Sequence, residues 1–435
     1  MKKFFTLVLV SALVLPLSIT LPAATPTAKP EEVGLSAERL KRVTELVQRH
    51  LDAKSFSGAV TLVARNGRIG HFEAHGLMDV ESKKPMQKDA MFRIMSMTKP
   101  VVGVAILMLI EEGKVRLTDN VSKWIPELKD MQVAVPQPAP PAGRGGAPAA
   151  GGAQPGGAPP APRFYTVPAE REITIRDLLT HTSGLGSGTI SNYTRRAVAL
   201  KDKESLADFI PRLGKTVLEF QPGTRWAYSA QDGFDVLARI VEIVSGTGFD
   251  QFARQRIFDP LGMKDTYFYP AGNPRTATQY NRQNGELRRV QGESNFINGA
   301  YFSGGGGLFS TPEDYLQFGL MLVNGGQLNG KRLLAPRTVE LMGSIAAPDT
   351  LPGRPKGESY GLSVRVVNDP MARNSWLSEG SFGWSGAFGT HFWVDRKQNL
   401  VAVVMTQTSN QEFLRDFENM VMQAVVGDRT VGGTN

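Results

Sequence analysis

Hydrophobic and polar residues follow clear patterns over the first part of the chain. Apolar residues recur at helical spacing over 40–51, after a serine that can cap a helix, and this predicts an amphipathic helix. Two runs of strand composition, 59–64 and 69–74, flank an Asn66-Gly67 pair. Because an Asn-Gly pair favours a type I′ turn, these residues predict a β-hairpin.

The pattern becomes helical in the middle of the chain and returns to strands near its end. Residues 101–110 are apolar nearly all round, which is typical of a buried helix. Further helices are predicted at 174–179, 206–213, 233–245 and 310–321. Strands are predicted at 360–366, 388–395 and 400–406, and a last helix at 410–426. This order predicts an α+β fold: an antiparallel sheet built from both termini, flanked by helices, with a mostly helical inserted part.

We expect one large domain over residues 30–435. Its sheet part spans about 30–95 and 345–435, and its helical part spans about 96–344. Within the helical part, residues 132–163 are mostly Pro, Ala and Gly, with almost no large apolar side chain. Such a segment cannot bury enough apolar surface to offset its ordering entropy, so a disordered insertion is predicted there.

Residues 1–24 have the three parts of a secretory signal peptide. Lys2 and Lys3 form a basic start, an apolar stretch follows over 4–21, and Pro-Ala-Ala at 22–24 supplies a small-residue exit. An uncleaved membrane anchor is the alternative, because the apolar stretch is nearly long enough to span a bilayer. We expect cleavage and export to the periplasm or outside the cell, with no stable membrane insertion afterwards.

The composition excludes several classes of function. The chain of 435 residues has no cysteine, which excludes disulfides, thiolate metal sites and a cysteine nucleophile. Its net charge of +8 is spread along the chain without a dense basic block, so no nucleic-acid partner is indicated. His71 and His75 lie four apart in a predicted strand, which separates them by roughly 13 Å, too far to share one metal ion. We therefore expect no metal and no cofactor.

A serine and a lysine stand three residues apart at the start of the apolar helix. Positions i and i+3 share one helix face, so the Lys99 amine can reach the Ser96 hydroxyl. A serine becomes a nucleophile when a neighbouring base takes its proton. A lysine serves as that base only where burial or nearby cations favour its neutral form. Because Ser-x-x-Lys occurs about once by chance in a chain of this length, the pair alone leaves an ordinary structural role open.

A second serine also fits a hydrolase motif. Residues 357–361, Gly-Glu-Ser-Tyr-Gly, match the Gly-x-Ser-x-Gly elbow around Ser359. That elbow needs a strand before it and a helix after it. Here a loop rich in proline and glycine comes before and a predicted strand follows, so we interpret the match as accidental.

Two further segments can complete a site around Ser96. Tyr228 lies just before a predicted helix and can project its hydroxyl away from that helix, although an ordinary half-buried tyrosine is the alternative. The small residues at Ser385-Gly386 permit close backbone approach to a ligand, or form only a tight turn. The backbone N–H groups of Ser96 and Ala387, the latter on a predicted edge strand, can form an oxyanion hole.

The chain resembles the serine β-lactamase and penicillin-binding-protein superfamily in three segments that occur in the same order, 96–99, 228–230 and 384–386. Within this superfamily it is most similar to class C β-lactamases and family VIII carboxylesterases. Residues 175–185 look like the segment that precedes the active-site region in this superfamily. The resemblance covers nearly all of 34–426 and implies a β-lactamase/transpeptidase-like fold.

The resemblance also implies a serine hydrolase that works through an acyl-enzyme. Ser96 would be the nucleophile, and Lys99 would ease its deprotonation. Tyr228 would be the general base, alone or shared with Lys99, and would return the proton to the leaving group. The residues implied to contact the substrate are Ala230, Trp384, Ser385 and Gly386.

Two departures from the penicillin-recognising members bear on the substrate. Those members usually carry Asn at the place of Ala230 and Lys at the place of Trp384. Losing a charge-assisted contact of roughly 1.5–3 kcal/mol weakens binding of a β-lactam carboxylate more than binding of a neutral ester. We therefore expect a carboxylesterase of small or medium acyl esters. A β-lactamase or D-amino-acid peptidase or carboxypeptidase is the alternative, and a non-catalytic cell-envelope binding protein of the penicillin-binding fold is a further one.

Overall fold

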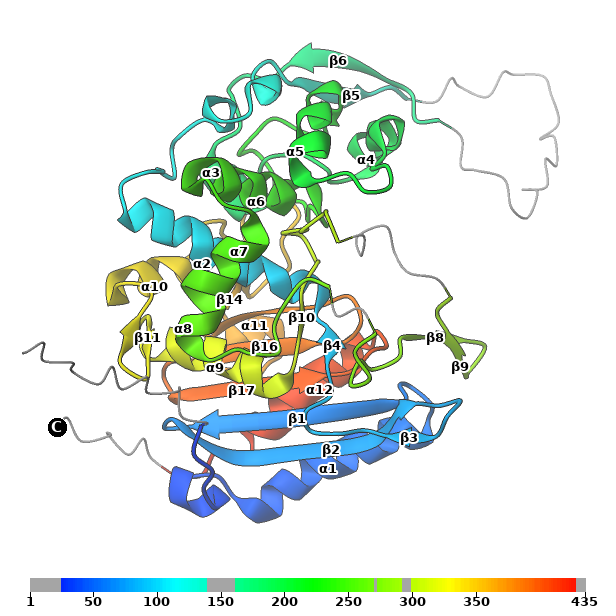
Figure 1. Ribbon diagram of the computed structural model, residues 1–435, viewed down its shortest axis with the longest axis vertical. Helices are drawn as coiled ribbons and strands as arrows, with labels where there is room; N and C mark the ends of the chain where they lie inside the picture. The colour runs from blue at the N-terminus through cyan, green and yellow to red at the C-terminus, as the bar shows by residue number, and fades with distance from the viewer. Residues whose placement is uncertain (1–24, 139–160, 270–271, 292–298, 428–435) are drawn as a thin grey trace, which may run out of the picture.

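The computed structural model describes residues 25–138, 161–269, 272–291 and 299–427. A group of helices lies on one side of a large antiparallel sheet, and two further helices cover the opposite face (Figure 1). The α+β class predicted from the sequence is confirmed. The predicted signal peptide lies outside the described residues. Within those ranges every helix is too short or too polar to span a bilayer.

Eight strands form the main sheet. Their bounds are β1 (Gly58–Arg65), β2 (Arg68–Asp79), β3 (Lys84–Pro85), β13 (Glu358–Tyr360), β14 (Arg365–Val367), β15 (Phe382–Ser385), β16 (His391–Asp395) and β17 (Leu400–Met405). They lie in the order β13-β14-β15-β16-β17-β1-β2-β3, and neighbouring strands run antiparallel. Because β1 pairs with β17, the centre of the sheet joins the beginning of the chain to its end.

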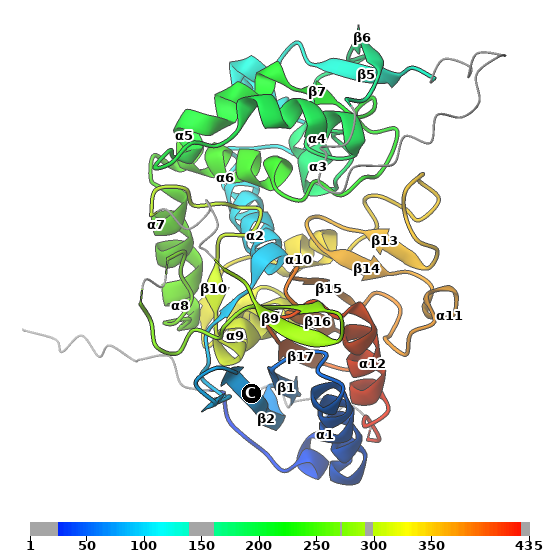
Figure 2. The same cartoon turned by 90° about the vertical axis from the view of Figure 1, so that its right-hand side faces the viewer.

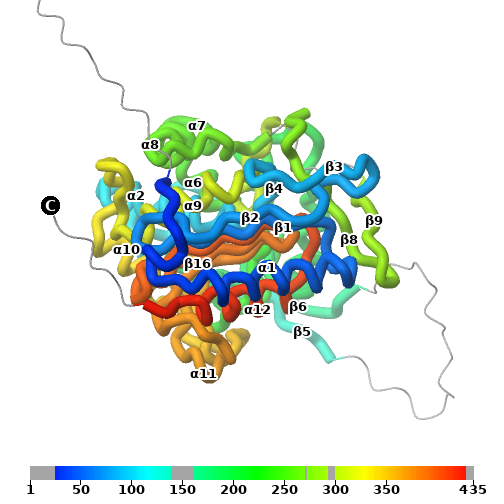
Figure 3. The backbone as a smooth tube through the Cα atoms, turned by 90° about the horizontal axis from the view of Figure 1, so that it is seen from below, coloured from blue at the N-terminus to red at the C-terminus, as the bar shows by residue number. Residues whose placement is uncertain are grey.

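The sheet is covered on both faces. Along β1, Leu62 belongs to the core under the main group of helices, whereas the next residue, Val63, belongs to a second core on the other face. Helices α1 (Ala37–Asp52) and α12 (Gln411–Met422) lie side by side over that second face (Figure 3). Successive side chains of a strand point to opposite faces, so a strand with two covered faces is buried along its whole length and is mostly apolar, as β1 is.

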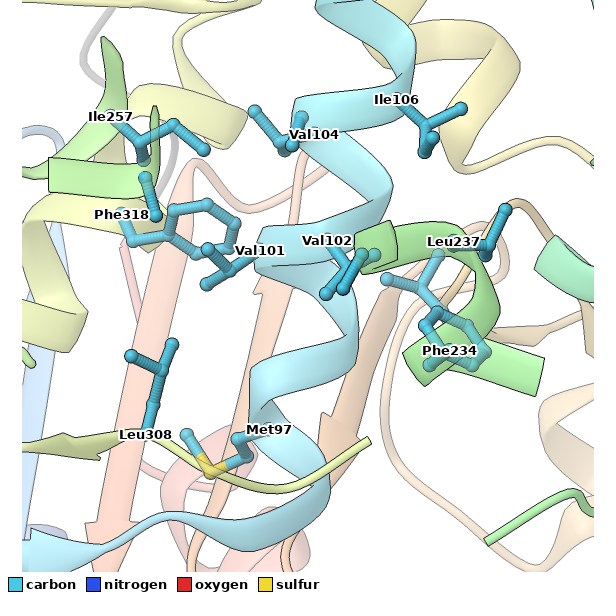
Figure 4. Close-up of a cluster of buried hydrophobic side chains, with 14 of the residues drawn as sticks. Met97, Val101, Val102, Val104, Ile106, Phe234, Leu237, Ile257, Leu308 and Phe318 are labelled. Atoms are coloured by element: carbon cyan, nitrogen blue, oxygen red, sulfur yellow. The ribbon is translucent and has the colours of Figure 1, made fainter. Parts of the chain in front are cut away.

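Helix α2 (Thr98–Glu111) lies between the sheet and the other helices (Figure 2). All of its residues except the last two are buried. Figure 4 shows its apolar side chains among those of α6 (Asp232–Ser245) and α9 (Pro312–Val323), with Val102 directed toward Phe234. A helix packed on all sides needs no polar face, which explains the apolar run that the sequence shows.

The remaining elements are short. The other helices are α3 (Ile175–Leu179), α4 (Thr189–Arg195), α5 (Leu206–Phe209), α7 (Phe249–Ala253), α8 (Asp259–Leu261), α10 (Pro336–Met342) and α11 (Pro370–Arg373). The small sheets pair β4 (Phe92–Arg93) with β10 (Phe309–Ser310), β8 (Tyr280–Gln283) with β9 (Glu286–Arg289), and β11 (Gln327–Leu328) with β12 (Lys331–Arg332). Strand β5 (Gln132–Pro136) lies between β6 (Phe164–Pro168) and β7 (Val217–Leu218).

The predicted disordered insertion at 132–163 is wrong at its beginning. Residues 132–136 form β5, whose backbone is paired on one side with β6 and on the other with β7. Val133 and Ala134 are buried there, so the segment does carry a small apolar surface. Of the remainder, 139–160 lies outside the described residues.

Several element boundaries differ from the prediction: the last helix ends at Met422 instead of 426, and three further differences have a local cause. The strand expected at 360–366 is two strands, β13 and β14, because a turn intervenes in which Ser363 has φ +69°. The strand expected at 388–395 begins at His391, after a turn in which Gly389 has φ +86°. The helix expected at 206–213 is α-helical only to Phe209 and continues as a 3-10 helix, since Pro211 cannot donate the N–H that an α-helix requires.

Candidate active site

Ser96 lies at a sharp turn between a strand and the buried helix. After β4, Met95 adopts φ +47° and begins a 3-10 turn, Met95–Met97, that continues into α2. The left-handed conformation costs a non-glycine residue on the order of 1–3 kcal/mol, so the surrounding packing has to hold it. Tyr315 contributes to this by donating a hydrogen bond to the Met97 carbonyl at 2.6 Å. The turn brings Ser96, which is 9% exposed, to the wall of a cavity.

The Lys99 amine is fully buried beside Ser96. Its Nζ donates to Ser96 Oγ at 3.2 Å, to the Ala230 carbonyl at 2.6 Å and to the Gly305 carbonyl at 2.7 Å. Three acceptors match the three N–H donors of a lysine ammonium. The same Nζ lies 5.0 Å from the centre of the Tyr228 ring. Lys99 is therefore placed as a cation that can stabilise negative charge arising next to it.

Tyr228 approaches Ser96 from the loop before α6. Its hydroxyl donates to Ser96 Oγ at 2.6 Å, a distance suited to proton transfer. His181 packs against the Tyr228 ring with centroids 4.8 Å apart, and its Nδ1 accepts a hydrogen bond from the Ser229 N–H at 3.2 Å. Burial, and secondarily Lys99, keep the pKa of His181 well below its usual value, so the ring is neutral and can accept that bond. His181 thus fixes the backbone that carries Tyr228.

A buried carboxyl group holds the other loop that contacts Lys99. Asp235 on α6 accepts hydrogen bonds from Ser303 Oγ at 2.7 Å and from the Gly305 N–H at 2.8 Å, both on one oxygen, and from the Tyr301 hydroxyl at 2.7 Å on the other. Burial raises the pKa of Asp235 to about 6, although these hydrogen bonds oppose the rise. Because the Gly305 carbonyl accepts from Lys99, Asp235 positions the lysine through the backbone of a single residue.

The third predicted segment closes the cavity on the sheet side. Trp384 and Ser385 end β15, and Gly386 follows at a place where a Cβ atom would come within 2.3 Å of the Ile94 carbonyl oxygen. Only glycine lets this strand end approach the turn that carries Ser96 so closely. The cavity has a volume of about 340 Å³. Its lining residues are Ser96, Tyr228, Glu358, Arg365, Arg373, Trp384, Ser385, Gly386, Ala387, Gln411 and Arg415.

The predicted position of Ala387 on an edge strand is wrong. β15 has partners on both sides, β14 and β16, and Ala387 lies after β15 in the turn that leads to β16. The sheet continues past β15 because β13 and β14 add to it. Ala387 nevertheless lines the same cavity as Ser96, so an oxyanion hole formed by the N–H groups of these two residues stays a prediction.

A charged network that the sequence did not point to begins at the wall of this cavity and extends into the protein behind it. Arg365 and Arg373 both donate to the buried carboxylate of Glu418, at 2.6 Å and 2.8 Å. Glu418 also contacts His391 Nε2 at 3.0 Å, and His391 Nδ1 contacts Ser385 Oγ at 2.8 Å. These residues come from β14, α11, α12, β16 and β15, so no local sequence pattern could have joined them.

The competing motifs do not lie at this site. Ser359 is 1% exposed on β13, where its hydroxyl donates to Asn368 Oδ1 at 3.0 Å, and a turn rather than a helix follows β13. His71 and His75 on β2 both face Glu73, at 4.0 Å and 2.9 Å. Neither set of residues lines the cavity of Ser96.

The fold and the grouping of serine, lysine and tyrosine are those expected of a serine hydrolase, and sequence comparison supports this class. The family model described as Beta-lactamase matches residues 43–426, so the chain belongs to this family. With its esterase relatives, this makes the protein a serine hydrolase.

Three similar proteins illustrate the relationship. Protein Rv1367c of Mycobacterium tuberculosis is 35% identical over 82% of this chain and 87% of its own length. Esterase EstB of Burkholderia gladioli is 29% identical over 90% of this chain and 95% of its own. The solved structure of EstCE1, described as a hydrolase with promiscuous acyltransferase activity, has a TM-score of 0.73 and 25% identity, covering 89% of this chain and 98% of that one.

Proposed function

We propose that the protein is a carboxylesterase that hydrolyses small or medium acyl esters through an acyl-enzyme on Ser96. The observation that carries this proposal is the contact of Ser96 Oγ with both Tyr228, at 2.6 Å, and Lys99, at 3.2 Å, on the wall of a cavity. A serine hydroxyl within hydrogen-bond distance of a tyrosine that can exchange a proton with it, and of a buried lysine, is arranged for nucleophilic attack. Similarity to Esterase EstB supports an ester as the substrate.

In the proposed acylation step, Tyr228 as the phenolate takes the proton of Ser96, and Ser96 Oγ attacks the ester carbonyl carbon. The N–H groups of Ser96 and Ala387 would stabilise the oxyanion that forms, a contribution worth on the order of 3–4 kcal/mol for one such donor. The tetrahedral species collapses by breaking the bond to the alkoxide, which takes the proton from Tyr228 and leaves as the alcohol. The Lys99 ammonium compensates the negative charge throughout.

In the proposed deacylation step, water replaces the alcohol. Tyr228, again as the phenolate, takes a proton from the water molecule while its oxygen attacks the acyl carbon. Collapse of the second tetrahedral species breaks the bond to Ser96 Oγ, which recovers its proton from Tyr228. The products are a carboxylic acid and the free enzyme, so atoms and protons balance over the cycle.

The residues beside Ser96 favour an ester over a β-lactam. Trp384, which lines the cavity, offers no cation, and Ala230, which is not among the lining residues, offers no side-chain amide. The indole of Trp384 lies 5.6 Å from the Tyr228 ring and adds an apolar surface to the cavity. An apolar wall favours binding of a neutral acyl chain.

The test compares Ser96→Ala with Ser359→Ala as a matched control. Hydrolysis of 4-nitrophenyl butyrate is expected to fall by at least about 1,000-fold in Ser96→Ala and to stay unchanged in Ser359→Ala. A fluorophosphonate should add one phosphonyl group to the wild type, seen by intact mass, and none to Ser96→Ala. The opposite pattern would move the chemistry to Ser359, and nitrocefin turnover as fast as ester turnover would favour a β-lactamase.

We also propose that residues 1–24 direct export and are then removed. The basic start, apolar stretch and small-residue exit of this segment support the proposal. The mass of the protein recovered from periplasm and culture medium is expected to match a chain that begins near residue 25. Recovery of the full-length chain from the cell interior would overturn it.

A further inference from the structure

The cavity beside Ser96 contains a second serine, Ser385, whose hydroxyl is hydrogen-bonded to a chain of two buried side chains. Ser385 Oγ lies 2.8 Å from His391 Nδ1, and His391 Nε2 lies 3.0 Å from Glu418 Oε1. His391 and Glu418 are each 1% exposed, whereas Ser385 is half-buried and lines the cavity. The direction of these two hydrogen bonds decides what Ser385 can offer to a substrate.

Glu418 can only accept hydrogen bonds. Arg365 donates to its Oε1 at 2.6 Å, and Arg373 donates to its Oε2 at 2.8 Å. Burial by itself would raise the pKa of Glu418, but Arg365, His391 and Arg373 together lower it far below its usual value. An ionised carboxylate carries no proton to donate, so His391 Nε2 must be the donor in the bond between them.

A neutral imidazole carries one ring proton, so with that proton on Nε2 its Nδ1 can only accept a hydrogen bond. Burial lowers the pKa of His391 more than Glu418 raises it, and the positive charges of Arg365 and Arg373 act in the same direction as burial. A neutral His391 therefore accepts at Nδ1, and the single proton of the Ser385 hydroxyl is used in that bond. Only the lone pairs of Ser385 Oγ are left to face the cavity.

We propose that Ser385 is a specificity-determining residue that accepts a hydrogen bond from the substrate, and that His391 and Glu418 are positioning residues that fix this polarity. The substrate class is an ester that carries a hydroxyl or N–H donor near its reacting carbonyl. This inference rests on the proposed esterase function of Ser96. The absence of a cation at Trp384 is one reason why a substrate carboxylate is disfavoured here. The polarity of Ser385 is a second reason, because the carboxylate oxygens would face the lone pairs of Ser385 Oγ.

The arginines of the cavity do not contradict this polarity. Arg365 and Arg373 are paired with Glu418, and Arg373 also donates to Glu358 at 3.2 Å. Arg415 is exposed and could attract a carboxylate elsewhere in the cavity. The decisive comparison is therefore between a hydroxyl and a methoxy group, which are both uncharged and differ in the donor.

The experiment measures kcat/KM for two such pairs of esters. One pair varies the acyl part, with 4-nitrophenyl glycolate and 4-nitrophenyl methoxyacetate; the other varies the alcohol part, with the butyrates of 3-hydroxybenzyl and 3-methoxybenzyl alcohol. Each rate is divided by the rate of alkaline hydrolysis of the same ester. In at least one pair the wild type is expected to prefer the hydroxyl compound by about fivefold, the effect of one neutral hydrogen bond.

The variants separate the polarity of Ser385 from structural damage. Each ratio compares kcat/KM for the hydroxyl ester with that for the methoxy ester in the same protein, so a general loss of activity cancels. Ser385→Ala should bring the ratio to about one, and Ser385→Thr should retain it. His391→Phe should also lower it, because Ser385 can then turn its proton to the cavity. A wild-type ratio near one in both pairs, or a ratio that survives Ser385→Ala, overturns the inference while the esterase function stands. No hydrolysis of any of the four esters by the wild type overturns both.

Discussion

Asp235 couples the stability of the protein to pH through a buried carboxyl group. Its pKa is raised from 3.8 to about 6, chiefly by burial. A raised carboxyl pKa contributes stability that is fully present below 3.8 and is lost as the pH rises through about 6. The shift corresponds to about 3 kcal/mol, of which about 2–3 kcal/mol falls between pH 4 and pH 7.5.

Asp235→Asn removes this titration and keeps the shape of the side chain. The amide oxygen can replace the carboxyl oxygen that accepts from Ser303 and Gly305, and the amide NH2 then faces the Tyr301 hydroxyl. The loop that holds Lys99 should therefore stay in place. We expect kcat on 4-nitrophenyl butyrate to change by less than about threefold in Asp235→Asn, and to fall much further in Asp235→Ala, which leaves the loop donors without an acceptor.

Chemical denaturation between pH 4 and pH 7.5 provides the assay. The free energy of unfolding of the wild type should fall by about 2–3 kcal/mol relative to that of Asp235→Asn as the pH rises over this range. Asp314 is a matched control, because burial also raises its pKa to about 6, and its carboxylate binds Thr266 and the Asp265 N–H instead of the Lys99 loop. Relative to Asp314→Asn, the unfolding free energy of the wild type should fall by a similar amount over the same pH range. Neither Asp314→Asn nor Asp314→Ala should change kcat, because Asp314 does not contact the loop that holds Lys99. Parallel stability curves for wild type and Asp235→Asn would refute the reasoning.

Three other substitutions test separate parts of the structure. Tyr228→Phe should reduce kcat by about 100- to 10,000-fold without changing the melting temperature, and an unchanged kcat would exclude Tyr228 as the base. Gly103→Ala places a methyl group 1.8 Å from Ser363 Oγ and should cost about 1–3 kcal/mol of unfolding free energy. Adding Ser363→Gly removes that oxygen and should recover much of the loss in a double-mutant cycle. Glu418→Gln removes the carboxylate shared by two largely buried arginines, Arg365 and Arg373, which keep only the more distant contacts with Glu358. It should cost about 3–5 kcal/mol of unfolding free energy, whereas a loss below 1 kcal/mol would show that the network contributes little.

The parts of the site that depend on short-range spacing could be predicted from the sequence. Ser96 and Lys99 are three residues apart at the start of α2, so helix geometry alone brings their side chains together. The strand composition of β1 and the apolar run of α2 likewise identified a strand and a buried helix. Tyr228 is distant in sequence, and its place beside Ser96 followed only from the family resemblance.

The parts that depend on tertiary structure could not be predicted. The left-handed backbone at Met95 is imposed by packing, because no property of methionine favours it. The link from Asp235 through Gly305 to Lys99 joins three separate segments. The boundary between β13 and β14 depends on Ser363 adopting a positive φ, which the strand composition of this region conceals. In each case the neighbours of a residue decide its conformation or role, and they are far away along the chain.

The pairing of β1 with β17 sets an order of events during synthesis. Six residue pairs join the two strands, from Val60 with Met405 to Arg65 with Leu400. The ribosome makes β1 roughly 340 residues before its partner, which takes on the order of 20–70 s at ordinary rates of translation. Throughout that time an apolar strand has an open edge that another chain can pair with. The yield of folded protein in a cell should therefore depend on chaperones that protect this edge more than on the stability of the finished molecule.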